Sequence, residues 1–453
     1  MVNIFLQIFV LICFLGVVII LFFEEHDYIY FTFLFIVIAG ITTAIFVPEA
    51  RSLEYYVEAI EWEVVFFLIA MFTIVEILKQ NKIFDEIARL IVIKYQHNLR
   101  KAFYIIIVIS TLLATIVEDL SIAMIFAPII IVASRKLNMR PAAYLLGMTI
   151  CINIAATLTP FGSAQNILIS TEFGLDIFWF IVNLAPYFII SLFSSLFLLD
   201  KGILKKDILY CSNHKCTPDD INEIDLLAEP NIEKHKFILN IVALIILIIL
   251  FITIPQLYLA ALIGALLFGA INPVNKKDKE TQSLKVKVKK RVSLSYYLLK
   301  VDYKLIYFFM ALFIFVGLME LNGTIEIIEN LIKNVSAENE FFLAIIILLT
   351  TSILSGLIDN TPVTIIFIPI VRVLFNLPEF ALGPLVIAFI LGINLGGNFL
   401  PQGSAADMMT LEISRDNNVK DMSYKRLTKV GGLFALFHIL LGVGYLAVIV
   451  FLF

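Results

Sequence analysis

The sequence predicts an all-α polytopic membrane protein that contains an inverted repeat, two re-entrant helical hairpins and two broken helices. Of its 453 residues, 61% are hydrophobic and only 15% are charged, whereas a soluble globular chain has about 25% charged residues. Apolar runs such as 4–23 and 432–453 are long enough to cross a bilayer. Unusual residues of the first half also return in the second half at a constant spacing.

The N-terminal region, residues 1–61, is expected to hold two transmembrane helices. Residues 2–23 and 28–47 are apolar and are joined by an acidic turn, and 48–61 is polar and mixed. The first run has no basic segment before it and no small-residue cleavage site, so we expect a retained helix rather than a signal peptide.

The first repeat, residues 62–199, contains the most unusual pair of residues in the chain. Segment 102–134 holds two apolar runs, each too short for a straight crossing of a ~30 Å core. Glu118 and Asp119 lie between these runs. One acid at a helix centre costs roughly 2.5–3.5 kcal/mol, so an adjacent pair requires water, an ion, a proton or an oppositely charged partner from elsewhere in the fold. A re-entrant hairpin with the acids at its tip fits this pattern better than two full spans.

The segments around the hairpin are also helical by their pattern. In 83–95, apolar residues recur at helical spacing opposite a charged face, which is typical of a helix at the membrane interface. In 142–172, amides, hydroxyls, a proline and a glycine interrupt a membrane sequence. Unwound backbone is tolerated at that depth only where protein or a water-lined cavity surrounds it. We therefore expect a broken helix, followed by a crossing helix over 177–199.

Residues 200–302 are expected to form a linker with a polar loop, two transmembrane helices and a basic cytoplasmic loop. The polar loop is 200–235, the short apolar runs are 237–251 and 257–271, and a lysine-rich stretch follows at 276–291.

The second repeat, residues 303–453, follows from one constant spacing. Asp359 lies 241 positions after Glu118, and the same spacing relates Asn394 to Asn153. It also pairs Phe72 with Phe313, Asn81 with Asn322, Phe126 with Phe367, Pro128 with Pro369, Pro160 with Pro401, Gly162 with Gly403 and Ser163 with Ser404. This recurrence indicates a tandem duplication, with a second hairpin over 341–375 and a second broken helix over 380–414.

The charges indicate that the two copies are inverted. Six basic residues flank the first hairpin: Lys94, Arg100, Lys101, Arg135, Lys136 and Arg140. Three acids and one base flank the second: Glu338, Glu340, Glu379 and Arg372. By the positive-inside rule, the first hairpin opens to the cytoplasm and the second to the outside. An inverted repeat with two broken helices is the architecture of a secondary transporter.

Each copy combines an acidic tip with an unwound helix that is rich in oxygens and amides. The expected ion- or substrate-binding residues are Glu118, Asp119, Asn153, Thr157, Ser163, Asn166, Asp359, Asn360, Asn394, Asn398, Ser404 and Asp407. Glycines at four positions are expected to allow tight turns or close backbone approach: Gly162, Gly396, Gly397 and Gly403. Oxygen ligands suit hard cations, so bound Na⁺ is possible at Glu118, Asp119, Asn153, Asp359 and Asn394.

The charge balance of these segments favours protons and cations. They contain four acids and no Lys, Arg or His. Four ionised acids would repel a dicarboxylate, and two adjacent carboxylates favour retention of a proton on one of them. A carboxylate that exchanges a proton for a cation is the simplest device for antiport.

The chain resembles the ion transporter superfamily, which holds arsenite permeases, D-type sodium/proton antiporters, the melanosomal P protein and citrate or dicarboxylate permeases. The resemblance lies in the second-repeat tip 358–361 (Ile-Asp-Asn-Thr) and the break 394–404, which contains Asn-Leu-Gly-Gly-Asn. In the first repeat, 153–157 and 162–166 are similar to the family's Asn-x-Gly-Gly-Thr and Gly-Asp-x-x-Asn. The resemblance implies an inward and an outward hairpin, ion and substrate sites at their tips, an elevator-like motion and a homodimer.

The chain also departs from the family pattern. Glu118-Asp119 stand where the arsenite and antiporter branches usually carry Asp-Asn, and Asp407 stands where Asn is common. Ala155-Ala156 replace two glycines, and Ser163 replaces the usual Asp. Neither tip has the Ser-Asn-Thr of the dicarboxylate branch, which weakens a dicarboxylate interpretation.

The leading hypothesis is a secondary active transporter, a cation/proton antiporter of the Na⁺/H⁺ type. The alternatives are an arsenite, citrate/dicarboxylate or other anion permease, and, from another class, an anion channel or a non-transporting membrane protein. We expect no enzyme, since no nucleophile–base pair or metal-ligand cluster appears, and no cofactor beyond a coupling Na⁺ or H⁺. The expected surroundings are the lipid bilayer of the cell membrane and a small substrate, without nucleic acid.

Overall fold

The computed structural model describes residues 4–20, 28–95, 98–117, 119–136, 139–213, 232–275, 291–292, 294–301, 303–327, 339–358, 360–375 and 382–452. Glu118 and Asp359, two of the expected site residues, lie outside this part of the chain. The described residues are almost entirely helical, as the sequence predicts for an all-α membrane protein.

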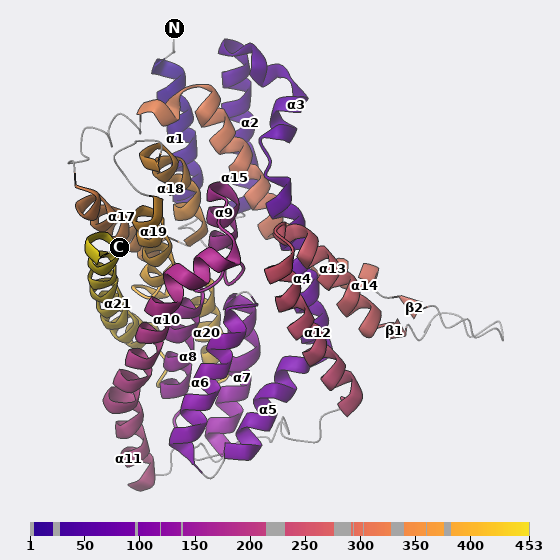
Figure 1. Ribbon diagram of the computed structural model, residues 1–453, viewed down its shortest axis with the longest axis vertical. Helices are drawn as coiled ribbons and strands as arrows, with labels where there is room; N and C mark the ends of the chain where they lie inside the picture. The colour runs from indigo at the N-terminus through magenta and orange to yellow at the C-terminus, as the bar shows by residue number, and fades with distance from the viewer. Residues whose placement is uncertain are drawn as a thin grey trace, which may run out of the picture.

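The N-terminal region forms two apolar helices and a short connection. Its elements are α1 (Ile4–Ile20), α2 (Tyr28–Phe46), η1 (Pro48–Arg51) and α3 (Leu53–Glu58). Helices α1 and α2 pack against each other and against α15 (Tyr303–Leu321) of the second half. Together they form the end of the molecule at the top of Figure 1.

The first repeat contains the helix pair and the broken helix in the expected order. Its elements are α4 (Trp62–Gln80), α5 (Ile83–Tyr95), α6 (Leu99–Ala114), α7 (Asp119–Lys136), α8 (Ala142–Ala155), α9 (Ala164–Phe173) and α10 (Ile177–Leu199). The interruption between α8 and α9 falls on the polar segment that contains Pro160 and Gly162.

The helix α10 continues where the sequence predicts a polar loop from residue 200. A π-helical turn, η2 (Asp200–Leu204), leads directly into α11 (Lys205–Asn213). Three ion pairs among the described residues hold this extension. Arg100 Nε lies 3.0 Å from Asp200 Oδ1, and Asp207 lies 3.8 Å from Arg140 Nη1 and 3.7 Å from Arg426 Nη2. The partners come from distant segments, so the local sequence alone does not predict the extension.

The linker and the second repeat complete the chain. The linker holds α12 (Lys234–Thr253), α13 (Leu257–Ile271), α14 (Leu294–Leu298) and a short antiparallel ladder of β1 (Val274–Asn275) and β2 (Arg291–Val292). The second repeat holds α15 (Tyr303–Leu321), α17 (Glu340–Leu357), α18 (Asn360–Phe375), α19 (Leu382–Gly396), η3 (Pro401–Gly403), α20 (Ala405–Asp416) and α21 (Tyr424–Leu452).

The helix boundaries recur at the spacing of 241 residues seen in the sequence. The bounds of α4, shifted by this spacing, are those of α15, and α9 shifted in the same way begins where α20 begins. The shifted bounds of α7 and α8 fall within two residues of those of α18 and α19.

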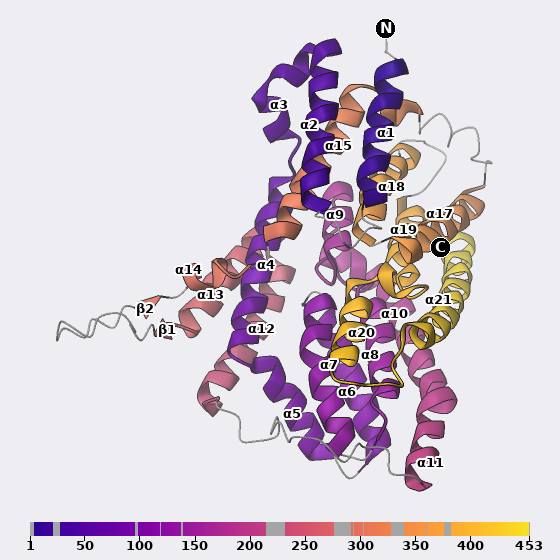
Figure 2. The ribbon, with the colours of Figure 1, turned by 180° about the vertical axis from the view of Figure 1, so that it is seen from behind.

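The packing of the helices follows the same correspondence. Helix α6 packs on α8 as α17 packs on α19. The second half-helix of each break packs against the helix pair of the other copy, α20 on α7 and α9 on α18. Figures 1 and 2 show α6, α7 and α20 in the lower half of the molecule, and α9 and α18 in the upper half.

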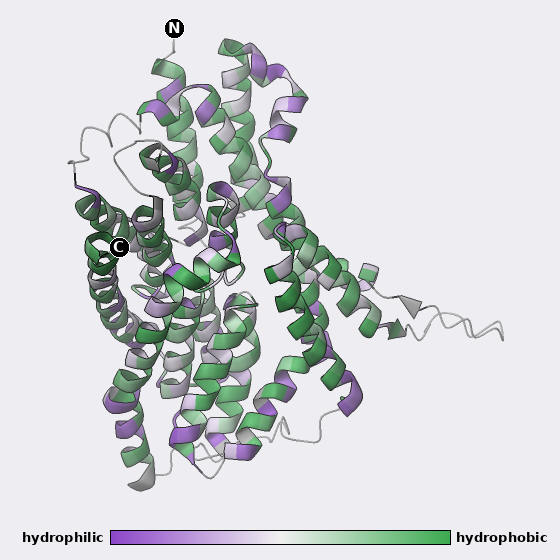
Figure 3. Ribbon diagram, viewed as in Figure 1, coloured by the Kyte–Doolittle hydropathy of each residue, from purple (hydrophilic) through white to green (hydrophobic). Residues whose placement is uncertain are grey.

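The apolar surface of the described helices fits a membrane protein. Within the described residues, five helices are long and apolar enough to cross a bilayer: Ile29–Phe46, Ile177–Cys211, Lys234–Thr253, Glu340–Leu357 and Tyr424–Leu452. Figure 3 shows hydrophobic residues along the middle of these helices and hydrophilic residues at α3 and toward the lower ends of α5, α6 and α12. The shorter apolar helices α8 and α19 lie inside and are almost completely buried.

Candidate functional site

In the first break, the side-chain amide of Asn166 bridges the unwound backbone. Ser163 caps α9, because its Oγ accepts a hydrogen bond from the backbone N–H of Asn166 at 3.3 Å. The Asn166 Nδ2 donates to the carbonyl of Ala156 and, at 2.9 Å, to that of Thr159. Thr157 donates its hydroxyl hydrogen to the Ile154 carbonyl at 2.7 Å. Two carbonyls of the unwound backbone, those of Ala156 and Thr159, are therefore satisfied by a side chain of the same segment.

The second break is built on close backbone contact with α17. A Cβ at Gly396 would lie 2.4 Å from the carbonyl oxygen of Ser352, and one at Gly403 would lie 2.6 Å from that of Ser355. Such distances leave no room for a side chain, so α17 and this break can pack this closely only with glycine at both positions. In the first break the contact is looser, since a Cβ at Gly162 would meet its nearest neighbour at 3.2 Å.

The two breaks are hydrogen-bonded to each other in the interior. The Asn153 Nδ2 donates to Asn398 Oδ1 at 2.9 Å, and Ser404 Oγ donates to Asn153 Oδ1 at 3.0 Å. In the other direction, Ser163 Oγ donates to Asn394 Oδ1 at 3.2 Å, and Asn394 Nδ2 donates to Asn166 Oδ1 at 2.9 Å. All of these side chains are at most 2% exposed. Six of the expected site residues thus form two hydrogen-bonded sets of three, and each set joins positions more than 200 residues apart.

One contact between the breaks occurs twice. Asn153 and Asn394 are related by the spacing of 241 residues, and so are Ser163 and Ser404. The serine of each break therefore donates to the asparagine of the other, as a two-fold relation between the copies requires. The remaining contacts differ, because Asn398 corresponds to Thr157 in the first copy, a threonine bonded within its own turn.

The tips of the two helix pairs approach the breaks from opposite ends. Asp119 is the first residue of α7, where its Oδ1 accepts from the Leu120 N–H at 2.7 Å. Asn360 is the first residue of α18, and with its amide nitrogen turned toward the break it donates to the Gly403 carbonyl at 2.8 Å. Gln165 of α9 donates to the Thr361 hydroxyl at 3.3 Å. The second tip therefore contacts both breaks.

Asp407 differs from the other buried site residues. It is 0% exposed, and neither carboxylate oxygen has a hydrogen-bond partner in the described part of the chain. The Nδ2 of Asn398 also has no partner there. Unpartnered buried polar atoms are rare in folded proteins and need an explanation, such as a ligand, an ion or a water molecule.

The sodium site expected from the sequence is only partly within the described residues. Of its five expected ligands, Asp119, Asn153 and Asn394 are described. Among the described residues, no group of three or more His, Cys, Asp and Glu side chains is placed to hold a metal ion. The amide oxygens of Asn153 and Asn394 each accept one hydrogen bond from a serine, which leaves one lone pair on each oxygen for a cation.

A second charged site, near α18, was not expected from the sequence. Arg372 of α18 forms an ion pair with Glu172 of α9, and its Nη1 lies 2.9 Å from Glu320 Oε1 of α15. With Glu61, these side chains line a cavity of about 210 Å³. The sequence contains one indication of this site, the acid Glu320 at the end of a mostly apolar span. Its partner Arg372 is more than fifty positions away along the chain, so the pairing could not be predicted.

Comparisons with known proteins agree with this architecture. A family model described as "Citrate transporter" matches residues 18–279 and 259–453, which together cover most of the chain. The chain is 22% identical to an uncharacterized transporter of Mycobacterium tuberculosis over 91% of this chain and 92% of that protein. It is 24% identical to an uncharacterized transporter of Methanocaldococcus jannaschii, with 91% and 97% covered. The inner membrane protein YbiR of Escherichia coli is 23% identical, with 85% and 88% covered.

These relatives are membrane proteins or transporters, and they match along nearly their whole length. The match to the family includes both helix pairs and both breaks. Together with the apolar helices of spanning length, it indicates a multi-pass membrane transporter. The chain belongs to the citrate transporter family, within the ion transporter superfamily.

Proposed function

We propose that this transporter is a cation/proton antiporter that works by alternating access. The observation that carries the proposal is that the two tips and the two breaks contain acidic residues and no basic ones. Segments 115–119, 156–166, 358–361 and 397–407 contain acids, amides and hydroxyls, and no Lys, Arg or His. A buried site of this composition attracts small cations and protons, and it disfavours anions that arrive without a cation.

The relation between the two halves supports alternating access. Recurrent helix bounds, the repeated serine–asparagine contact and the exchange of helix partners between copies fit an inverted repeat. In transporters of this design, the site lies at the interface of the repeats near the bilayer midplane, where broken helices meet. We propose that Asn153 and Asn394 occupy that position here and contact the transported ion together with the acids of the tips.

The decisive experiment measures proton movement in proteoliposomes. Purified protein is reconstituted with a pH-sensitive dye inside, a proton gradient is imposed, and Na⁺, Li⁺ or K⁺ is added outside. We expect a cation-dependent pH change for at least one of these ions, which is absent from protein-free liposomes. A protein that shows no proton flux with any of the three contradicts the cation version of the proposal.

A matched pair of variants links the flux to the breaks. Asn394→Ala removes an amide that joins both breaks and is expected to abolish the flux. Asn183→Ala removes a half-buried amide of α10 that donates only to the Trp179 carbonyl, at 2.8 Å, and the flux should persist. Equal flux from both variants would show that the joined breaks are not the ion site.

A second candidate is uptake of citrate or a related carboxylate, with arsenite as a neutral alternative. The family description favours this candidate, and so does Asn398 Nδ2, a buried donor without an acceptor in the described residues. A carboxylate substrate would supply that acceptor, provided that a cation bound with it offsets the acids. Uptake of labelled citrate or arsenite without cation-driven proton flux would favour this candidate over antiport.

Two expectations from the sequence stay predictions. Single-channel currents in planar bilayers would indicate the channel alternative rather than a carrier. The homodimer implied by the family resemblance can be tested by the mass of the protein–detergent complex, measured by light scattering.

A further inference from the structure

The buried face of α20 is polar in a way that its counterpart in the first half is not. Asp407, Thr410 and Ser414 are spaced to lie on one side of the helix, and all three are 0% exposed. In α9 the corresponding positions hold Asn166, Ile169 and Phe173. A polar stripe therefore runs along the contact of α20 with α7 and α8, and the equivalent contact of α9 has only its first polar position.

The copies also differ at the tip that faces this helix. Asp119 begins α7, and its counterpart Asn360 begins α18. Since α7 packs on α20 and α18 packs on α9, one packed pair carries Asp119 with Asp407, and the other carries Asn360 with Asn166. The amide pair shows that the same packing forms without acids. The two acids are therefore not needed for the fold, and they concentrate negative charge at one of two equivalent places.

The surroundings of Asp407 supply no described positive charge. Helix α8 and the turn η3 contain no Asp, Glu, Lys, Arg or His. On α7 the facing charges are Asp119, which repels a charge on Asp407, and Arg135, which donates to the Asn417 carbonyl at the far end of α20. On α20 itself, Glu412 and Arg415 line the outer cavity described next. An isolated ionised carboxylate costs several kcal/mol inside a protein unless a cation or proton accompanies it.

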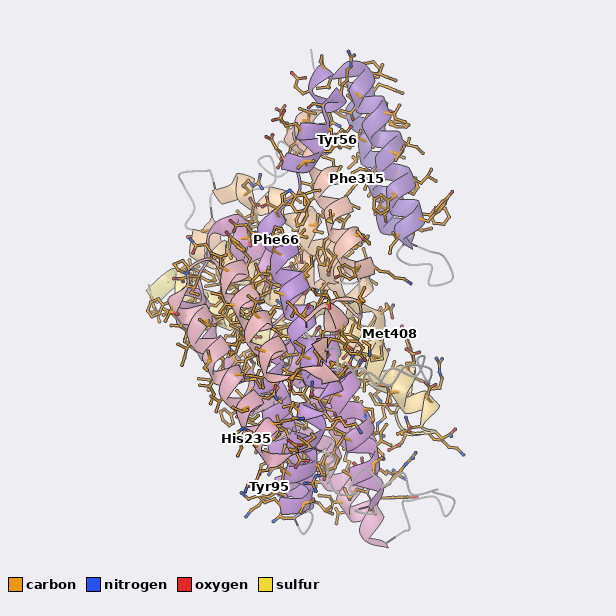
Figure 4. The ribbon with its side chains drawn as sticks, turned by 90° about the vertical axis from the view of Figure 1, so that its right-hand side faces the viewer. Tyr56, Phe66, Tyr95, His235, Phe315 and Met408 are labelled. Carbon is orange, nitrogen blue, oxygen red and sulfur yellow. The ribbon has the colours of Figure 1, made fainter. Side chains whose placement is uncertain are left out.

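A cavity lies on the face of α20 next to the buried stripe. This cavity, of about 590 Å³, is lined by one face of α20, including Met408 and Leu411, and by residues of the segment 418–424. Met408 is the neighbour of Asp407 in sequence, and Figure 4 shows it at mid-height of the molecule, between Tyr56 above and Tyr95 below. The cavity therefore reaches the turn of α20 that carries Asp407, on the face next to the one that bears the buried stripe.

The hydroxyl oxygens along the stripe can coordinate a cation that moves along it. Thr410 donates to the Ala406 carbonyl at 2.8 Å, and Ser414 donates to the Thr410 carbonyl at 2.6 Å. Such bonds to the preceding turn are common in membrane helices, and each leaves the lone pairs of the hydroxyl oxygen available. The hydroxyls alone prove nothing. Their significance comes from alignment with an unpartnered acid.

We propose that Asp407 is the single cation-binding acid of the second break and that Thr410 and Ser414 line its access path, with no counterpart in the first half. The proposal deepens the proposed antiport, on which it rests, by assigning one small monovalent cation to one of two duplicated places. The first break, closed by Asn166, then serves as a structural partner rather than as a second cation site.

The test measures cation binding through thermal stability in detergent, with NaCl, LiCl or KCl exchanged against choline chloride at constant ionic strength. A ligand that binds only the native state raises the unfolding temperature with its concentration. We expect the wild type to follow a one-site curve. Asp407→Asn should weaken the response about 100-fold or more, beyond the 10–100-fold typical of residues that support a ligand indirectly. Without cation, this variant should unfold no lower than the wild type, because an unpaired buried charge has been removed.

A second variant pair tests the path. Thr410→Val removes a hydroxyl of the stripe without changing its size and should slow proton flux or weaken the cation response several-fold. Thr350→Val removes a hydroxyl that makes the same bond to the preceding turn, at 2.6 Å to Ile346, on an exposed face of α17, and it should change neither.

The outcomes separate this inference from the proposed function. A wild type with no response to any of the cations and no flux contradicts both. A wild type that responds, combined with an Asp407→Asn variant that responds equally, overturns only the assignment of the site. A two-site binding curve in the wild type overturns the single-site proposal, and a lower unfolding temperature of cation-free Asp407→Asn would indicate a structural role.

Discussion

The contact that occurs twice between the breaks allows a quantitative test of the two-fold relation. We consider the double-mutant cycle of Ser163→Ala and Asn394→Ala, and the equivalent cycle of Ser404→Ala and Asn153→Ala. In each cycle, the serine hydroxyl donates to the asparagine amide oxygen, at 3.2 Å in the first and 3.0 Å in the second. If the copies are related as proposed, the two coupling energies should agree.

The magnitudes follow from the bonds that each change removes. Asn394→Ala removes the bonds with Ser163 and Asn166 and the bond to the Ile390 carbonyl. It also leaves buried polar groups unpaired, at about 1–3 kcal/mol each, so a loss of roughly 3–5 kcal/mol is expected. Ser163→Ala also removes the cap of α9, which is worth about 0.5–2 kcal/mol. The coupling isolates one neutral hydrogen bond, about 0.5–1.5 kcal/mol.

Unfolding in mixed micelles, followed by circular dichroism, measures all four proteins of each cycle. The pair Asn240 and Asn272 provides a positive control, because these buried amides exchange hydrogen bonds of 3.1 and 2.8 Å between α12 and α13, away from the breaks. Independent sites add within about 0.3–0.5 kcal/mol. A coupling energy below that limit in both test cycles, with clear coupling in the control, would refute the hydrogen bonding between the two breaks.

Three further predictions concern packing, pH and surface charge. Gly396→Ala places a Cβ against the α17 backbone and should destabilise the protein by about 1–3 kcal/mol or more in the same unfolding assay, whereas Gly383→Ala, with nothing within 4 Å, should be tolerated. Burial raises the pKa of Asp85 in α5, so the native state holds its proton more tightly than the unfolded state. Stability should therefore fall as pH rises from the ordinary aspartate pKa upward, and Asp85→Asn should flatten the unfolding profile over that interval. Arg372→Gln removes a half-exposed partner of Glu172, so it should cost about 1 kcal/mol or less, and the difference from wild type should shrink in high salt.

Periodicity and polarity predicted the helices well where the cause is local. The interface helix over 83–95 and the span over 257–271 have the same bounds in the structure, as does the crossing helix that begins at Ile177. In each case, charged or helix-breaking residues end an apolar pattern on both sides. The interruption at 156–163 follows from proline, glycine and hydroxyl residues, which disfavour a continuous helix in that context.

The partners of the polar side chains depend on the tertiary structure and could not be predicted. The duplication places Asn153 and Asn394 in equivalent positions, but it does not indicate that each accepts from the serine of the other copy. The helix α11 was missed because its partners Arg140 and Arg426 come from other segments. The polar stripe of α20 could not be predicted from the sequence, because threonine and serine are ordinary residues at a helix end. Only the packing of α7 on α20 shows that these residues face another helix.

The hydrogen bonds between the breaks also restrict which motions could produce the alternating access proposed above. Separating the breaks would remove four buried side-chain bonds, about 0.5–1.5 kcal/mol each, and leave their partners unpaired at a greater cost. By contrast, the ion pair of Arg372 with Glu320, which joins α18 to α15, is about 40% exposed on both sides, and such pairs contribute about 0–1 kcal/mol. The weakest polar connection among these therefore lies outside the breaks. We expect the breaks and the tips to move as one body against helices such as α15, with the ion site intact.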